Sequence, residues 1–161
     1  MSSTAEPLAA RVIARLAADG LTLATSESLT GGLIGAALTS VPGASQVYLG
    51  GVIAYATTMK ARLSGADWEV LDIYGAVSAE AVTAMAKGVR QSTGADWAIA
   101  VSGVAGPSEQ EGHPPGTVWI AVSGARIGRS RRFGFAGDRS EVREQTVAAA
   151  LELLLAQLDP L

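Results

Sequence analysis

The sequence predicts an α/β fold, a three-layer α/β/α sandwich around a mixed, mainly parallel sheet. Apolar, β-prone runs alternate along the chain with segments whose apolar residues recur at helical spacing. The run at residues 97–101 is continuously apolar, which is typical of a strand buried on both faces of a sheet. With 161 residues and neither an internal repeat nor a linker, the chain is expected to form a single domain over residues 1–161.

The first half of the chain is predicted to run helix, strand, helix, strand. Gly20 ends the first helix and Val41-Pro42-Gly43 ends the second, because glycine and proline stop helices. The pair Gly50-Gly51 interrupts the second strand and indicates a bulge or a bend. The expected bounds are residues 8–18 and 32–40 for the helices, and 21–26 and 47–56 for the strands.

The second half adds further helices and three strands. Ser78 starts a helix that Gly94 ends, since serine caps helix N-termini and glycine caps C-termini. The last two strands are joined through residues 124–128 and are expected to be antiparallel, and either Asp138 or Ser140 caps the final helix. The expected segments are short helices near residues 60–63 and 68–73, a helix over 78–93, strands over 97–101, 117–122 and 130–135, and a helix ending near 158.

Composition and charge argue against several classes of protein. No apolar run approaches the roughly 20 residues that cross a bilayer, and the first residues form an amphipathic pattern without the features of a signal peptide. A formal net charge of −3 argues against a nucleic-acid partner. The chain has no cysteine for a disulfide or a thiolate site, and no His/Asp/Glu spacing indicates a metal. We therefore expect a cytoplasmic protein with no metal, no cofactor, and no nucleic-acid or membrane partner.

Polar or glycine-rich segments follow the three strands that are expected to be parallel. They are residues 27–32, 55–60 and 102–107. In open α/β sheets the ligand lies outside the carboxyl ends of the strands. If the three strands are neighbours, these segments converge on one rim, and Ser28 and Lys60 come within a few ångströms of each other.

Ser28 lies where the first strand turns directly into a helix of small residues. This position puts its hydroxyl beside unpaired N–H groups at the positive end of a helix dipole, which combines a nucleophile with an anion pocket. Thr30, Gly31 and Gly32 are the expected residues of that pocket. The alternative is a Ser/Thr helix cap with glycines for tight packing, which is common.

A serine nucleophile needs a base, and the chain offers two candidates. The only histidine, His113, lies in a polar loop with no Ser-His-Asp arrangement around it, which favours a solvated loop residue. Lys60 is one of two lysines against ten arginines, and desolvation lowers a lysine pKa toward neutrality, as Ser-Lys pairs require. The Tyr55 hydroxyl is then placed to hydrogen-bond the serine, the lysine or the substrate. The alternatives are an exposed helix lysine and a tyrosine packed on the core.

Glycine-rich and basic segments supply candidates for the rest of the site. Residues 102–107 let the backbone approach a ligand closely, or else make a simple turn. Arg139 and Arg143 lie near a predicted helix N-terminus, a good phosphate site, although a capping Asp138 with surface arginines explains them equally well. The arginines at 126–132 favour a solvated edge hairpin, because basic side chains on edge strands block aggregation.

Six motifs occur in an order that is similar to one known family. They are SESLTGG at 26–32, Tyr55-x4-Lys60, AVSAE at 76–80, SGVAGP at 102–107, PGTVW at 115–119 and GDR at 137–139. Over roughly residues 5 to 158 the chain resembles the CinA C-terminal domain family, whose stand-alone members are nicotinamide-nucleotide amidohydrolases.

The resemblance implies hydrolysis of the carboxamide of nicotinamide mononucleotide to nicotinate mononucleotide and ammonia, in pyridine-nucleotide salvage. It also implies a Ser/Lys hydrolase with a three-layer α/β/α fold. Carried over by position, Ser28 is the nucleophile, Lys60 its general base, and Tyr55 assists. The residues implied to contact the substrate are Glu27, Thr30, Gly31, Gly32, Ser102, Gly103, Ala105, Gly106, Pro107, Thr117, and Arg139 or Arg143 for the phosphate.

Two departures from the family pattern keep other hypotheses open. Ala56-Thr57 stands where the family usually has Ser-Asn, and Ser108-Glu109-Gln110 stands where it usually has an acidic residue and glycines. One alternative is therefore a nucleotide-binding module without catalysis, linked to competence or DNA-damage physiology, and another is hydrolysis of a different small amide or ester. The apolar hairpin and the Ala/Leu-rich final helix favour a homodimer.

Overall fold

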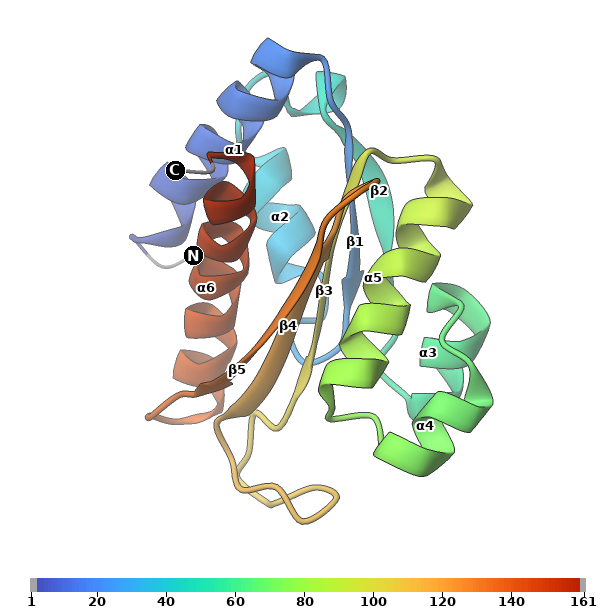
Figure 1. Ribbon diagram of the computed structural model, residues 1–161. Coiled ribbons are helices and arrows are strands. Elements are labelled where there is room, and N and C mark those ends of the chain that lie inside the picture. Colours follow the sequence, from blue (N-terminus) through green and yellow to red (C-terminus); the bar gives the residue numbers. More distant parts are fainter. Residues whose placement is uncertain (1–2, 160–161) are drawn as a thin grey trace.

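The structure is a computed structural model that describes residues 3–159 and contains one five-stranded sheet between helical layers (Figure 1). None of the helices in this range is both long and apolar enough to span a membrane. The strands are β1 (Leu23–Glu27), β2 (Tyr48–Ile53), β3 (Trp97–Gly103), β4 (Thr117–Ser123) and β5 (Gly128–Gly134). The helices are α1 (Ala5–Asp19), α2 (Leu33–Thr39), α3 (Thr57–Ser64), α4 (Trp68–Tyr74), α5 (Ala79–Thr93) and α6 (Arg139–Leu158), with a 3-10 turn, η1 (Ala44–Gln46).

The sheet is mixed, with strand order β2-β1-β3-β4-β5. β1 pairs in parallel with both β2 and β3, whereas β4 pairs antiparallel with β3 and with β5. Because β5 reverses the direction of β4, every strand except β4 points the same way. The expected three-layer sandwich with a mixed, mainly parallel sheet is confirmed.

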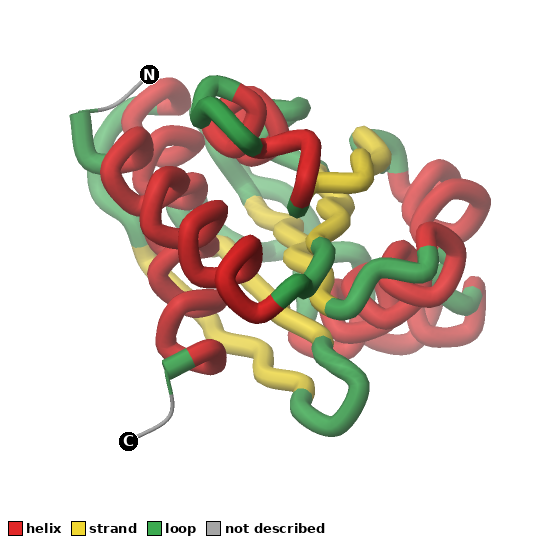
Figure 2. Tube along the Cα trace, turned by 90° about the horizontal axis from the view of Figure 1, so that it is seen from above, coloured by secondary structure: helices red, strands yellow, loops and turns green. Residues whose placement is uncertain are grey.

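Helices cover both faces of the sheet, with α1, α2 and α6 on one side and α3, α4 and α5 on the other (Figures 1 and 2). Successive strand residues point to opposite faces, so β3 sends its larger side chains, Ile99 and Val101, toward the α1/α2/α6 layer. Its small residues, Ala98 and Ala100, face the other layer, where α5 contacts β1, β3 and β4. The small residues allow α5 to pack closely against the sheet that carries the site.

Two boundaries and the position of one strand irregularity differ from expectation in informative ways. β2 ends at Ile53 instead of residue 56, although the Ala54 N–H still donates to the Glu27 carbonyl at 2.8 Å. Its irregularity lies at Leu49, which the β1 register skips. The helix expected near residues 60–63 spans Thr57–Ser64, so Lys60 lies inside it. Of the two candidate caps for α6, Asp138 is the one used, in a reciprocal capping box with Glu141.

Candidate active site

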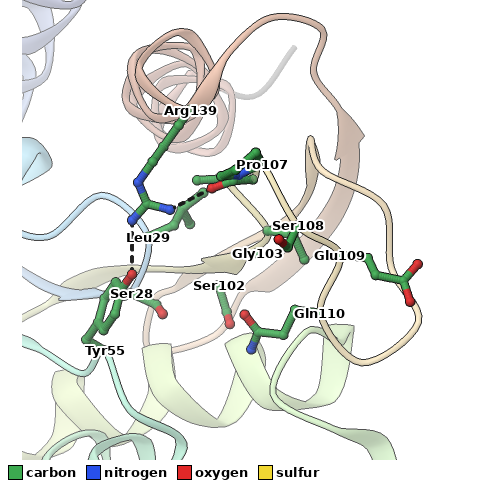
Figure 3. Close-up of a pocket in the computed structure, with 13 residues that line it drawn as sticks. Ser28, Leu29, Tyr55, Ser102, Gly103, Pro107, Ser108, Glu109, Gln110 and Arg139 are labelled. Atoms are coloured by element: carbon green, nitrogen blue, oxygen red, sulfur yellow. Dashed lines mark hydrogen bonds between the residues drawn. The ribbon is translucent and has the colours of Figure 1, made fainter.

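The carboxyl ends of β1, β2 and β3 lie side by side, and a pocket of about 370 Å³ opens there (Figure 3). This volume is within the range of small-molecule sites. The expected convergence of the three segments on one rim is therefore confirmed. The lining residues are Ser28, Leu29, Tyr55, Ser102, Gly103, Val104, Ala105, Gly106, Pro107, Ser108, Glu109, Gln110 and Arg139.

Ser28 and Lys60 are in direct contact, with Lys60 Nζ donating to Ser28 Oγ at 2.9 Å. Both residues are nearly buried, at 6% and 2% exposed. The parallel pairing of β1 with β2 produces this contact. Glu27 lies opposite Ile53 at the ends of the two strands, so the chain reaches Ser28 beside the segment that leads into α3.

The environment of Lys60 directs its amine at the serine. Nζ also donates to the carbonyl oxygens of Ala54 and Tyr55, both at 3.0 Å. Burial lowers the pKa of Lys60 from its ordinary 10.5 to about 8, while the charge of Glu111 acts in the opposite direction. A neutral amine has two N–H bonds and one lone pair. When the two carbonyls accept the N–H bonds, the lone pair is left for the Ser28 hydroxyl.

Glu27 braces the turn after β1 from inside. Its carboxylate accepts from the Thr30 hydroxyl at 2.6 Å and from the N–H groups of Ile34 and Gly35 at 2.9 and 3.0 Å. The side chain is 2% exposed and satisfies the start of α2. Glu27 and Thr30, expected to contact the substrate, are therefore occupied with each other and do not line the pocket.

Four further residues expected at the pocket also lie outside its lining. Gly31 and Gly32 adopt left-handed backbone, with φ of 57° and 103°, and the Gly31 N–H is bonded to the Ser28 carbonyl at 3.0 Å. Thr117 is buried at the start of β4. Arg143 donates to the carbonyls of Leu29 and Thr30 at 2.9 and 3.3 Å, so it braces the serine turn from outside.

Arg139 is the arginine that lines the pocket. It donates to the Gly106 carbonyl at 2.8 Å and to the Tyr55 hydroxyl at 3.0 Å (Figure 3). Arg139 holds the Tyr55 hydroxyl at the exposed rim of the pocket, so this hydroxyl contacts neither Ser28 nor Lys60. Two of the three partners expected for it, the serine and the lysine, are therefore wrong. Contact of Tyr55 with a substrate stays a prediction.

The wall of the pocket is the segment between β3 and β4. Ser102, Gly103, Ala105, Gly106 and Pro107 line it as expected. The Ser102 hydroxyl, however, donates to the Ala76 carbonyl at 2.7 Å, a contact that holds the wall to the turn before α5.

Sequence reasoning missed four lining residues: Leu29, Ser108, Glu109 and Gln110. Val104 lines the pocket within the segment 102–107 that was expected there. Ser108, Glu109 and Gln110 follow Pro107 in a long loop. The length of this loop was the one feature of the sequence that could have indicated their role, because long loops are often functional. Leu29 and Val104 have aliphatic side chains, which do not by themselves indicate a functional site. Figure 3 shows the Gln110 amide pointing toward Ser102, while the Glu109 side chain points away. His113 pairs through its backbone with Gln110 in the loop and does not line the pocket.

Other polar clusters contribute little to this site. Within residues 3–159 there is no group of three or more His, Asp or Glu side chains that could hold a metal ion. Arg129, Arg131 and Arg132 are exposed on β5, an edge strand, and Arg126 is exposed in the turn before it, which confirms the expected solvated edge.

Comparison with known proteins identifies the family. Residues 5–158 match the CinA C-terminal domain. The chain belongs to the CinA C-terminal domain family. A CinA-like protein of Parasynechococcus marenigrum is 46% identical over 159 residues, which are 97% of this chain and 38% of that protein. A CinA-like protein of Frankia casuarinae is 43% identical over 147 residues, 91% of this chain and 34% of its own length. This CinA domain thus spans little more than a third of these curated relatives.

Solved structures of related chains share the fold over almost their full length. The competence/damage inducible protein CihA from Agrobacterium tumefaciens superposes with a TM-score of 0.95 at 34% identity, covering 99% of this chain and 98% of that one. A competence-damaged protein (CinA) superfamily protein from Escherichia coli gives 0.93 at 33%, covering 98% and 93%. These matches establish the CinA architecture, whereas an activity has to be argued from the site.

Proposed function

We propose that this CinA domain hydrolyses the carboxamide of nicotinamide mononucleotide, with Ser28 as nucleophile and Lys60 as general base. The 2.9 Å contact between Lys60 Nζ and Ser28 Oγ beside the pocket carries the proposal. Lys60 is buried, and within residues 3–159 it forms no ion pair with a carboxylate. Burying an unpaired cation is costly, so its retention at a pocket favours a chemical role.

The proposed reaction uses the amine twice. Neutral Lys60 takes the proton of Ser28 as Oγ attacks the carboxamide carbon, and the carbonyl electrons move onto oxygen. The resulting ammonium then gives its proton to the leaving nitrogen, and the C–N bond breaks to release ammonia. Water attacks the ester in the same manner, with Lys60 again accepting a proton, and releases the nicotinate carboxylate and free Ser28.

Two backbone N–H groups are candidates for stabilising the transient oxyanion. Leu29 and Ala105 both line the pocket, and their N–H groups donate to no other residue in the described part of the chain. The N–H that follows the nucleophile is a common oxyanion donor in serine hydrolases. These groups replace the expected Thr30–Gly32 pocket in the proposal.

The rim supplies groups suited to a mononucleotide. The guanidinium of Arg139 lines the pocket, and a guanidinium can bind a phosphate through two parallel hydrogen bonds. The Tyr55 side chain beside it is 59% exposed and offers a flat face to a ring. We assign the phosphate to Arg139 and leave Arg143 to the serine turn.

Ammonia release from nicotinamide mononucleotide tests the proposal. Ser28→Ala and Lys60→Ala should each lower kcat by on the order of 10³-fold or more while circular dichroism shows the fold retained. Lys87→Ala, at the other lysine of the chain, is the matched control and should keep wild-type kinetics. Wild-type rates in both dyad variants would exclude the Ser/Lys mechanism.

Ala56-Thr57 and Ser108-Glu109-Gln110 depart from the residues usual in the family. These differences motivate a second candidate function, nucleotide binding without catalysis. Tight binding of a pyridine nucleotide by the wild-type protein, with no ammonia released, would support it. A panel of other small amides and esters distinguishes a different hydrolase substrate from both. Robust deamidation of nicotinamide mononucleotide would remove the binding-module hypothesis.

A further inference from the structure

The tip of the β3–β4 loop is a tight turn that carries a carboxylate. Gln110 and His113 pair through their backbones, with N–H to carbonyl bonds of 3.1 and 2.8 Å. The two residues between them, Glu111 and Gly112, have φ angles of 53° and 77°, as in a type I′ turn. This turn favours asparagine, aspartate or glycine at its first central position, and within residues 3–159 Glu111 is the only residue other than glycine with such backbone. The longer side chain of Glu111 therefore needs an explanation.

The Glu111 carboxylate lies in a socket formed by residues 75–77, the turn before α5. It accepts the N–H groups of Ala76 and Val77, both at 3.1 Å, one on each oxygen. Both of these residues are buried, and in the described part of the chain neither N–H has another acceptor. Gly75 leaves room for the carboxylate, because a Cβ there would lie 2.9 Å from one of its oxygens. The socket thus fits a group with two acceptor oxygens, and two successive N–H groups favour an anion.

The inner part of the pocket wall, residues 102–106, is held by the sheet and by α6. Val104 continues the ladder, since its N–H donates to the Thr117 carbonyl at 2.8 Å. The Arg139 guanidinium donates to the Gly106 carbonyl at 2.8 Å. The inner wall is therefore fixed without the turn at the tip of the loop.

The outer part of the wall, residues 108–110, depends on that turn. All three residues line the pocket, and the Gln110 amide points toward Ser102 (Figure 3). Their only hydrogen bonds within the range 3–159 join Gln110 to His113, inside the same turn. The loop projects beyond the end of the sheet in Figure 1. The carboxylate of Glu111, the next residue, therefore bonds the outer wall to the body of the domain.

We propose that Glu111 is a positioning residue, which holds the outer wall at the pocket so that Ser108 and Gln110 contact the substrate. This inference rests on the proposed function, which supplies the nucleotide. A hydroxyl and an amide can each donate and accept hydrogen bonds, which suits the neutral polar groups of a nucleotide. The reacting groups belong to the turn after β1 and to α3, so release of the outer wall should weaken binding and leave the chemical step intact.

The test compares two substitutions of Glu111. Glu111→Asn suits the type I′ turn but is one methylene shorter, whereas Glu111→Gln keeps the length and only one of the two acceptors. KM for nicotinamide mononucleotide should rise about ten-fold in Glu111→Asn and about three-fold in Glu111→Gln, with kcat within about two-fold of wild type. Hydrogen exchange at the Ala76 and Val77 amides should become about ten-fold faster in Glu111→Asn. Asp72→Asn, at an exposed carboxylate of α4, is the control and should change none of these values.

A spin label reports on the outer wall without any substrate. The chain has no cysteine, so Ser108→Cys provides a single site for a nitroxide. Electron paramagnetic resonance should show a more mobile label when Glu111→Asn is added, and the same mobility when Asp72→Asn is added.

Unchanged exchange or unchanged label mobility in Glu111→Asn would overturn the proposal, because the carboxylate would then not hold the outer wall. A KM that stays within two-fold of wild type would overturn it as well, since the wall would then not contribute to binding. Neither exchange nor label mobility uses the nucleotide. A wild-type protein that releases no ammonia therefore refutes the proposed substrate, and these two measurements still decide whether Glu111 positions the wall.

Discussion

The turn after β1 and the loop between β3 and β4 form opposite sides of the pocket and are built in opposite ways. In the turn, Ser28 to Thr30 are buried, Glu27 bonds the turn from inside, and Arg143 bonds its carbonyls from outside. In the loop, residues 107–112 are exposed, and side-chain bonds from Arg139 and Glu111 hold it. Under the proposed function this contrast is a division of labour, in which the buried turn carries the nucleophile and the exposed loop carries substrate recognition.

The difference has an energetic basis. A buried carboxylate with three donors is strongly favoured in place, because removing it leaves those donors unsatisfied. The hydrogen bonds of an exposed loop compete with water and contribute less. Substitutions in the turn should therefore change stability and kcat, whereas substitutions at the loop and its rim should change KM.

The strongest way to break this contrast is Glu27→Ala. The change leaves the Thr30 hydroxyl and the N–H groups of Ile34 and Gly35 without their acceptor. The free energy of unfolding should fall by about 3 kcal/mol, and kcat by about 100-fold, as the serine turn loosens. Urea denaturation and ammonia release measure the two effects. Glu144→Ala, at an exposed carboxylate of α6, is the control, and a loss for Glu27→Ala no larger than in this control would contradict the rigid turn.

The second test uses the pH dependence of stability in Lys60→Met. The pKa of Lys60 is about 8 in the folded protein and 10.5 ordinarily, so between these values the unfolded chain binds the extra proton. The free energy of unfolding of the wild type should therefore rise relative to the variant as pH increases from 8 to 10.5, by about 3 kcal/mol in total.

Urea denaturation of both proteins over this pH range measures the rise. Taking the difference between them removes the contribution of Tyr48, whose pKa is raised by burial above its ordinary 10.0. A difference that stays constant with pH would show that Lys60 is not held in an environment that disfavours its charge.

The third test, with the smallest expected effect, compares an arginine at the rim of the pocket with an arginine at the serine turn. Arg139→Ala should raise KM for nicotinamide mononucleotide about ten-fold and leave kcat within about three-fold, because the guanidinium is assigned to the non-reacting phosphate. Arg143→Ala is the matched variant on the turn side, and it should lower kcat more than it raises KM. Steady-state kinetics of both variants decide the assignment, and the reverse pattern would exchange the two roles.

The order of helices and strands was predictable from the sequence because it depends on local patterns of apolar, glycine and proline residues. The continuous apolar run of β3 and the glycine and proline stops predicted the order of elements, and parallel pairing predicted that Ser28 and Lys60 meet. The contact at 2.9 Å follows from that topology. To predict this contact it was enough to assume that β1, β2 and β3 are neighbours in one sheet.

The polar contacts within the site were not predictable in the same way. Thr30 and Arg143 have the chemistry of ligand-binding groups, yet the backbone and a buried carboxylate satisfy them. A sequence shows which side chains can form hydrogen bonds, but it does not show which of them are already bonded to another group inside the protein. Leu29 escaped notice for the complementary reason, since its proposed contribution to the site comes from its backbone N–H group.

The two carbonyls that orient Lys60 have an evolutionary consequence. Ala54 and Tyr55 lie in the same short segment as the lysine, so the proposed base and the carbonyls that orient it are inherited together. A single insertion or deletion between Thr57 and Lys60 would rotate the amine around α3 by about 100° and end the contact with Ser28. Natural variation in chain length should therefore be absent from the first turn of α3.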